Sequence, residues 1–247
     1  MKISVITVCY NSAQTIEDCI QSVLSQDYDD VEYIVIDGAS SDSTGTILDK
    51  YASGISHIVS EPDTGIYNAM NKGVALATGD IIGILNSDDL YADKNVLSTV
   101  AKEFTDASVD GLCTDVSIFS GNRDNIRRKY RCTSWKPWMF RIGHQPPHPG
   151  FFVRKKCYST FGNFNEDYRT AADFDLLFRF IYKHKIKVKY LGFSSVYMRG
   201  GGASQNGFKA ISKANLEVHN SLKRNGYFSW FPLIWLKYAV KVFQFIL

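Results

Sequence analysis

Short apolar, β-branched runs alternate along the first hundred residues with segments in which apolar residues recur at helical spacing. The runs predict buried strands, and they cover residues 3–8, 33–36, 55–60 and 81–85. The amphipathic segments predict helices after each strand, and their apolar positions are Ile16/Cys19/Ile20/Val23/Leu24, Thr44/Ile47/Leu48/Tyr51, Ile66/Met70/Val74/Ala77 and a stretch over 93–104. Alternating strands and helices imply right-handed crossovers, so we predict an α/β fold with a Rossmann-like, mainly parallel sheet flanked by helices.

The pattern loosens after residue 110. Apolar residues at 112, 116–119, 151–153, 188–193 and 196–198 predict further strands, and the polar, basic segment 121–136 predicts a loop. Residues 171–175 open a helix whose buried face would carry Phe174, Leu177, Phe178 and Ile181. A second helix is expected over 204–226, with Phe208, Ile211, Val218 and Leu222 turned inward.

The last 21 residues differ in character from the rest of the chain. Segment 227–247 is aromatic and apolar, with Lys237, Lys241 and Gln244 on one helical face. A helix from Pro232 would be about 24 Å long at ~1.5 Å per residue, shorter than a ~30 Å hydrocarbon core. It would lie in a membrane interface or, equally, cover the domain's own core or a partner subunit.

Length and composition indicate one large domain with a small appendage. With 247 residues and 45% hydrophobic content, we expect one domain over 1–226, a first half at 1–110 and a second half at 111–226, followed by the apolar helix 227–247. A net charge of +3 gives no sign of a nucleic-acid partner. The five cysteines are scattered without a Cys-x-x-Cys pair, and the N-terminus enters a strand directly, so a cytoplasmic protein without a signal peptide is expected.

Polar clusters follow four successive strands. They are residues 7–11, 37–42, 61–63 and 86–89, the last ending in the adjacent carboxylates Asp88 and Asp89. Each cluster alone is at least as consistent with a turn and a helix cap. In a parallel sheet, however, all four strand ends meet at one edge, where ligands bind, so together they favour a ligand site.

The residue types at these ends suit a phosphorylated ligand. Asp88 and Asp89 offer hard oxygens to a divalent cation, whose shell phosphate oxygens usually complete. Asp37 is placed to accept hydrogen bonds from a base or ribose, and Tyr10 to stack on a base, although ordinary packing explains Tyr10 equally. Lys72 is either a phosphate contact or a solvated helix lysine.

A second group of candidates lies in the other half of the chain. Asp173, at a helix start between Ala172 and Phe174, is the candidate general base, with a plain helix cap as the alternative. Residues His144, Gln145 and His148 are candidates for contacting an acceptor, and each histidine is otherwise an ordinary loop residue. The histidines lack the close spacing of a zinc site.

These motifs resemble those of the family-two inverting glycosyltransferases with the GT-A fold. The resemblance rests on Thr7-Val8-Cys9-Tyr10-Asn11, on the run from Asp37 to Thr44, on the run from Glu61 to Gly73, on Leu85-Asn86-Ser87-Asp88-Asp89, and on Ala171-Ala172-Asp173-Phe174-Asp175. It covers roughly the first hundred residues and one later acidic motif.

The resemblance implies a nucleotide-diphosphate-sugar donor, with a UDP-sugar as the first expectation, and Mg²⁺ or Mn²⁺ as cofactor. It implies that Asp88 and Asp89 form the metal motif, with Asp89 as the favoured first contact, and that Asp173 is the base of a direct, inverting displacement. The donor-binding residues would be Thr7, Cys9, Tyr10, Asn11, Asp37, Ser40, Asp63, Asn68, Lys72 and Asp88.

The sequence departs from the family pattern at two points. Ser87-Asp88-Asp89 replaces a literal Asp-x-Asp, and Met70 stands where many relatives have Arg. No Gln-x-x-Arg-Trp motif follows Asp173, which argues against a processive cellulose- or chitin-type synthase.

Three functions remain open at this level. The leading one is a sugar transferase of cell-surface polysaccharide or lipid-linked oligosaccharide assembly, with a saccharide or lipid-linked acceptor, peripheral on the inner face of the cell membrane. The alternatives are a nucleotidyltransferase that makes sugar nucleotides, disfavoured because residues 8–13 contain no glycine, and a non-catalytic sugar-nucleotide-binding protein.

Overall fold

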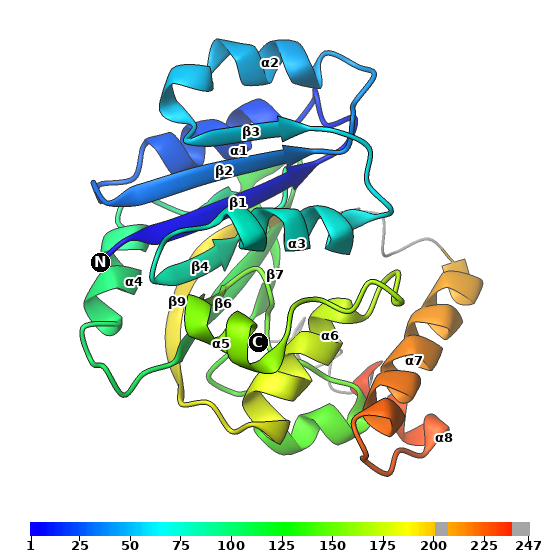
Figure 1. The fold of residues 1–247 in the computed structure, drawn as a ribbon. Helices are drawn as coiled ribbons and strands as arrows, with labels where there is room; N and C mark the ends of the chain where they lie inside the picture. Colours follow the sequence, from blue (N-terminus) through cyan, green and yellow to red (C-terminus); the bar gives the residue numbers. More distant parts are fainter. Residues whose placement is uncertain (201–206, 239–247) are drawn as a thin grey trace.

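The first half of the chain builds the predicted parallel sheet. The computed structural model describes residues 1–200 and 207–238. Four strands, β1 (Ile3–Cys9), β2 (Val31–Asp37), β3 (His57–Ser60) and β4 (Ile81–Ile84), run parallel in the order β3–β2–β1–β4 (Figure 1). Helices α1 (Ile16–Leu24), α2 (Thr44–Lys50) and α3 (Ile66–Leu76) connect them, with a 3₁₀ turn, η1 (Ala52–Gly54), after α2. The predicted alternation of strands and helices is confirmed.

The second half continues the sheet with mixed directions. Strand β8 (Phe151–Arg154) pairs antiparallel with β4 and with β6 (Gly111–Ser120), and β9 (Val188–Arg199) pairs parallel with β6. A two-residue strand, β5 (Leu90–Tyr91), pairs antiparallel with β9. The sheet is therefore mainly parallel only in its first half, because β8 enters it from a distant part of the chain rather than through a strand–helix–strand crossover.

The basic segment predicted as a loop is a strand, so that prediction is wrong. Strand β7 (Asn122–Tyr130) pairs antiparallel with β6, and most of its side chains are exposed. Strand β7 lies off the main order of strands and, among the described strands, pairs only with β6. Because most of its side chains are exposed, its sequence lacks the alternating apolar residues from which a strand is predicted. Charged residues on such an edge discourage pairing with other chains.

Helices cover both faces of the sheet. The second half contributes α4 (Val96–Glu103), η2 (Pro137–Ile142), α5 (Lys155–Phe161), α6 (Ala172–Leu177), the π-helical turn η3 (Phe178–Lys183), α7 (Gly207–Arg224) and α8 (Phe231–Ile234). Helix α5 was not predicted. The predicted buried face of the α6–η3 helix is confirmed, since all four of its predicted residues are buried.

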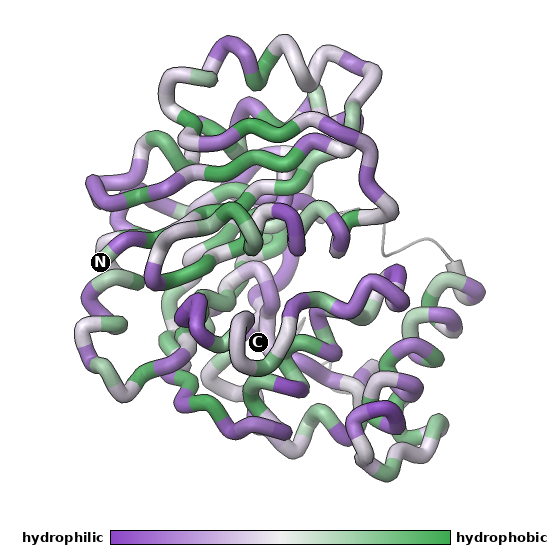
Figure 2. Tube along the Cα trace, viewed as in Figure 1, coloured by the Kyte–Doolittle hydropathy of each residue, from purple (hydrophilic) through white to green (hydrophobic). Residues whose placement is uncertain are grey.

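Two hydrophobic clusters, one on each face, form the core. Alternate residues of each strand point to opposite faces, so Ile6 and Ile36 pack with α3 and α6, whereas Val5 and Val35 pack with α1 and α4. Figure 2 shows the hydrophobic positions concentrated in the central strands and the hydrophilic ones on the connections.

The described part of the tail folds back on the domain. Helix α8 spans four residues, and Ile234 is fully buried next to Gly143 and Val218. The rest of the predicted tail helix, residues 239–247, lies outside the described residues, as does the start of the predicted helix 204–226. Within residues 1–200 and 207–238, no helix has both the length and the apolar character needed to cross a bilayer.

Candidate active site

The structure brings the four polar strand ends to one edge of the sheet. In the parallel register Cys9 lies beside Asp37, and Asp37 beside Ser60. Hydrogen bonds then join the loops: Ser12 Oγ lies 2.9 Å from Ser87 Oγ, and the backbone N–H of Asn11 donates to Ser40 Oγ at 2.8 Å. Strand direction alone therefore assembles one continuous polar rim from four separate segments.

Asp37 organises the loop after β2 from inside the protein. Its side chain is buried, and its Oδ2 accepts hydrogen bonds from the Ser40 backbone N–H (3.1 Å) and from Ser60 Oγ (2.6 Å), while Ser40 Oγ donates to Oδ1. The Cys9 thiol lies 3.6 Å from the same carboxylate, and burial, followed by the charge of Asp37, raises the pKa of Cys9. Asp37 thus holds the turn that follows β2 in place.

An exposed aromatic ring and a carboxylate flank Gly38. A Cβ atom at Gly38 would lie 2.5 Å from Asp63 Oδ2 and 3.3 Å from Tyr10 Cδ2, so the three residues are in close contact. The Tyr10 side chain is 64% exposed, which is unusual for a ring beside a buried strand end. Asp63 is fixed by the Gly65 backbone N–H, which donates to Oδ1 at 2.8 Å. This arrangement offers a flat face for stacking and an acceptor beside it.

Three other candidate donor residues are already engaged within the protein. Thr7 is fully buried and accepts a hydrogen bond from Tyr33 OH at 3.2 Å, so its side chain belongs to the core rather than to the rim. Asn68 Nδ2 donates to Glu166 at 2.9 Å, and Lys72 Nζ forms an ion pair with Glu61 at 2.8 Å. Asn68 and Lys72 are thus each held by a carboxylate of the protein.

The acidic pair divides into an inner and an outer carboxylate. Asp89 is 1% exposed, whereas Asp88 is partly exposed. Burial and then the neighbouring charge of Asp88 raise the pKa of Asp89 to about 8, against opposing effects of Asn86 and Arg199. Within the described chain, Asn86 Oδ1 and Asp89 Oδ1 are buried without a hydrogen-bond partner.

These oxygens fit a divalent cation. Buried acceptors without donors are costly, and a cation would relieve that cost while lowering the repulsion within the pair. Among residues 1–200 and 207–238, however, no cluster of three or more His, Cys, Asp or Glu side chains would bind a metal unaided. Ligand oxygens would therefore have to complete the shell.

Sequence reasoning missed a cation beside the pair. Strand β9 runs antiparallel to β5, with Tyr197 opposite Leu90, and this direction brings Arg199 close enough to Asp89 to lower the pKa of its carboxyl group. The Arg199 guanidinium pairs with Asp18 of α1 at 2.7 Å. No local signal marks Arg199, because only the pairing of two distant strands places it there.

Asp173 lies at the centre of a hydrogen-bonded group from three segments. Its Oδ2 accepts from Gln145 Nε2 at 2.5 Å and lies 3.2 Å from His148 Nδ1, and its Oδ1 accepts from Tyr67 OH at 3.4 Å. The Asp173 side chain is only 15% exposed. Burial raises the pKa of Tyr67, which therefore stays a hydrogen-bond donor.

Two of the three candidate acceptor residues thus contact the candidate base directly. His144 instead is buried in the core, with its ring edge-on to Tyr130 at 5.6 Å and its carbonyl oxygen bonded to Trp135 Nε1 at 3.0 Å. Tyr67 was missed by the sequence analysis, although its position four residues after Asp63 links the donor rim to Asp173. The sequence signal that could have identified Tyr67 is a polar aromatic side chain four residues after Asp63, the carboxylate that follows β3.

Sequence comparison places the chain in a family. The family description that matches, Glycosyl transferase family 2, covers residues 4–166. An uncharacterized glycosyltransferase of Mycobacterium tuberculosis is 32% identical over 183 residues, which are 72% of this chain and 68% of that protein. A PGL/p-HBAD biosynthesis glycosyltransferase of Mycobacterium bovis is 27% identical over 202 residues, covering 76% and 73% of the two chains.

Solved structures share the fold. Residues 1–349 of Staphylococcus aureus TarS in complex with UDP-GlcNAc superpose with a TM-score of 0.68 at 19% identity, over 89% of this chain and 67% of that one. The mannosyltransferase PcManGT of Pyrobaculum calidifontis, in complex with GDP-Man and Mn²⁺, gives 0.66 at 22% identity, over 90% and 63%. This chain spans 40% of a longer TarS chain. The resemblance seen in the motifs is confirmed, and the protein belongs to glycosyl transferase family 2, as a glycosyltransferase with the GT-A fold.

Proposed function

We propose that the protein transfers a sugar from a nucleotide-diphosphate-sugar to an acceptor hydroxyl with inversion at the anomeric carbon. The observation that carries this proposal is the setting of Asp173, a largely buried carboxylate that accepts hydrogen bonds from Gln145 and Tyr67 and pairs with His148. Structures of the same fold contain UDP-GlcNAc or GDP-Man, which supports a sugar-nucleotide donor, and a UDP-sugar remains our first expectation.

The donor half comprises residues 1–110. Tyr10 stacks on the base, and the loop ordered by Asp37 and Ser40 receives the ribose, with Asn11 and Asp63 at its sides. The support for these roles is the exposed ring of Tyr10 beside the Gly38–Asp63 contact and the internal hydrogen bonds that fix the loop.

Asp88 and Asp89, together with Asn86, would hold Mg²⁺ or Mn²⁺ against the diphosphate. The buried oxygens of Asn86 and Asp89 support this assignment, as does the Mn²⁺ of the related mannosyltransferase. Bound there, the cation would neutralise charge on the departing diphosphate. The positive charge of Arg199 lowers the pKa of Asp89 and so favours its charged form.

Asp173 acts as the general base. The acceptor hydroxyl oxygen bonds to the anomeric carbon while its proton moves to an Asp173 carboxylate oxygen, and the bond from that carbon to the diphosphate breaks. Gln145, His148 and Tyr67 orient the carboxylate, and the low exposure of Asp173 limits competition from water.

The acceptor half comprises residues 111–226, and the acceptor is a saccharide or lipid-linked saccharide of cell-surface polysaccharide or oligosaccharide assembly. Five buried free thiols are compatible with the reducing cytoplasm, where we place the protein, peripheral to the inner face of the membrane. The name of the mycobacterial relative, a PGL/p-HBAD biosynthesis glycosyltransferase, supports a biosynthetic role.

Asp173→Asn tests the assignment, with Asp167→Asn as a matched control on an exposed residue that pairs with Arg224 at 2.8 Å. A thermal-shift screen of nucleotide-sugars with Mn²⁺ first identifies the donor, because a bound ligand stabilises the protein by mass action. Asp173→Asn should then keep the donor-dependent shift and lose transfer, while Asp167→Asn keeps both. Transfer near the wild-type rate in Asp173→Asn would show that the base is misassigned.

A further inference from the structure

The outer face of helix α7 carries positive charge along its length. Lys209, Lys213 and Lys223 are exposed at intervals of four and ten residues, which place them on one stripe of the helix. Leu216, 50% exposed, and Asn220 lie on the same stripe between them.

The acidic groups around this stripe are engaged elsewhere. Glu217 is the only acidic residue in the described helix α7, and it accepts hydrogen bonds from the backbone N–H groups of Arg169 and Thr170 at 3.1 and 2.8 Å. Asp167 is paired with Arg224 at 2.8 Å. The stripe therefore presents three ammonium groups without a carboxylate on α7 to neutralise them.

The segment that follows α7, residues 227–232, exposes two large aromatic rings at alternate positions. Along 227–232, partly buried and exposed residues alternate. Tyr227 packs edge-on against Phe178 at 4.9 Å, and Ser229 Oγ lies 3.0 Å from His219 Nδ1. The outward positions are Phe228, 92% exposed, and Trp230, 59% exposed. Because Tyr227 and Ser229 hold the segment against the domain, the side chains of Phe228 and Trp230 point toward solvent.

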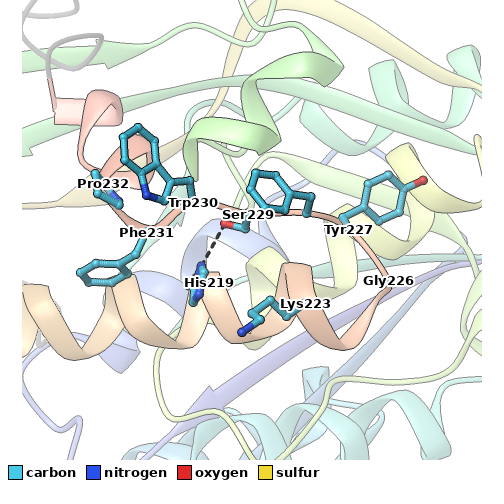
Figure 3. Close-up of a pocket in the computed structure, with 9 residues that line it drawn as sticks. His219, Lys223, Gly226, Tyr227, Ser229, Trp230, Phe231 and Pro232 are labelled. Carbon is cyan, nitrogen blue, oxygen red and sulfur yellow. Dashed lines mark hydrogen bonds between the residues drawn. The ribbon is translucent and has the colours of Figure 1, made fainter.

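The C-terminal lysine of the stripe, Lys223, and the aromatic segment line one groove. A groove of about 600 Å³ lies between α7 and this segment and is lined by Lys223, His219, Phe228 and Trp230. Figure 3 shows Lys223 and His219 on the helix facing the chain that carries Trp230 and Phe231. Cationic ammonium groups beside exposed aromatic rings are the side-chain combination found where a protein surface meets lipid head groups and acyl chains.

This surface is connected to the proposed active site through one helix. The buried side of α7 packs on α6, where Ser221 Oγ donates to Asp175 at 2.7 Å, and α6 carries Asp173 near its start. A bilayer on the outer side of α7 would thus be separated by one helix from α6, which carries Asp173 (Figure 1).

We propose that the lysine stripe of α7 (Lys209, Lys213, Lys223) together with Phe228 and Trp230 is a docking surface for a bilayer that contains anionic phospholipid. The charge complementarity of the stripe selects the lipid class, and the two aromatic rings insert at the head-group level. The inference rests on the proposed function only in that a lipid-linked acceptor gives the docking its purpose.

Co-sedimentation of the full chain with vesicles tests the surface. Wild-type protein should bind vesicles of phosphatidylglycerol and phosphatidylcholine, bind pure phosphatidylcholine far less, and be released by salt. Lys209→Gln/Lys213→Gln/Lys223→Gln should lower the partition coefficient roughly 100-fold. Phe228→Ser/Trp230→Ser should weaken binding even at low salt. A matched control, Lys94→Gln/Lys102→Gln/Lys187→Gln, removes the same charge from exposed lysines elsewhere and should bind like wild type.

Three results would overturn the proposal. They are no binding of the wild type to anionic vesicles, equal loss in the stripe and control triples, and undiminished binding of both stripe and aromatic variants. Far-ultraviolet circular dichroism and the melting temperature establish that each variant is folded. Donor binding, measured by thermal shift in the same preparations, separates the two proposals: vesicle binding without nucleotide-sugar binding contradicts the proposed function alone, and the reverse contradicts the docking surface alone.

Discussion

A substitution at Gly73 tests how closely helix α3 packs on the sheet. This helix carries Tyr67 and Asn68 toward the candidate site, and it packs against β1 and β2. A Cβ atom at Gly73 would lie 2.4 Å from Ile6 Cγ2, closer than real contacts allow. Ile6 is fully buried in the middle of β1, so its methyl group cannot move away cheaply.

Gly73→Ala should therefore destabilise the protein in spite of a better helix propensity. Overpacking costs about 1–3 kcal/mol, and replacing glycine by alanine inside a helix returns about 1 kcal/mol. We expect a net loss of up to about 2 kcal/mol in the free energy of unfolding. For a chain of this size, each kcal/mol lowers the melting temperature by about 2–4 °C.

The assay is chemical and thermal unfolding of a matched pair of variants. Gly45→Ala places the same methyl group in α2, where nothing lies within 4 Å, so it should leave stability unchanged or raise it by up to about 1 kcal/mol. A double-mutant cycle with Ile6→Ala adds specificity. Ile6→Ala alone should cost about 2–5 kcal/mol, and the double variant should be less destabilised than the sum of the single ones.

Close packing between Gly73 and Ile6 is refuted if Gly73→Ala is as stable as Gly45→Ala, or if the effects in the double-mutant cycle are strictly additive. Either result would mean that α3 can shift its position on β1 without loss of stability. In that case the position of Tyr67 against Asp173 would not depend on close packing at Gly73.

Three further predictions concern the site. Gln145→Met removes the donor to Asp173 Oδ2 and, since hydrogen bonds to charged groups contribute about 1.5–3 kcal/mol, should lower kcat about 10- to 150-fold with donor KM near wild type; a change in donor KM alone would contradict this role. Tyr10→Ala should weaken nucleotide binding by about 1–3 kcal/mol in calorimetric titration, whereas Tyr10→Phe should bind like the wild type. Equal affinities in all three proteins would show that Tyr10 does not stack on the base. Asp89→Asn should abolish the gain in nucleotide affinity that Mn²⁺ gives over EDTA, and a persistent Mn²⁺ effect would exclude Asp89 from the metal site.

Local patterns were enough for much of the fold. Helical spacing and β-branched runs identified strands β1 to β4 and helices α1 to α4, because these signals depend only on side chains a few positions apart. The parallel direction followed from the alternation, and with it the meeting of four polar strand ends at one edge. The position of Asp173 near the start of a helix was also predicted from the sequence, and α6 confirms that position.

Contacts between distant segments could not be predicted in this way. Strand β7 is charged and exposed, so it carries no apolar alternation, and only its pairing with β6 defines it. Thr7 belongs to a polar motif in the sequence, yet the pleat of β1 turns its side chain into the core.

The amino-acid sequence by itself determined the family, the order of the first elements and the identity of the acidic motifs, because each is encoded in residues close together along the chain. Only the tertiary structure decided which carboxylate of the pair is buried, that Arg199 lies beside it, and that Gln145, His148 and Tyr67 converge on Asp173. The physical reason is that burial and side-chain partners depend on packing between segments far apart in the chain, and no local pattern of residues specifies that packing.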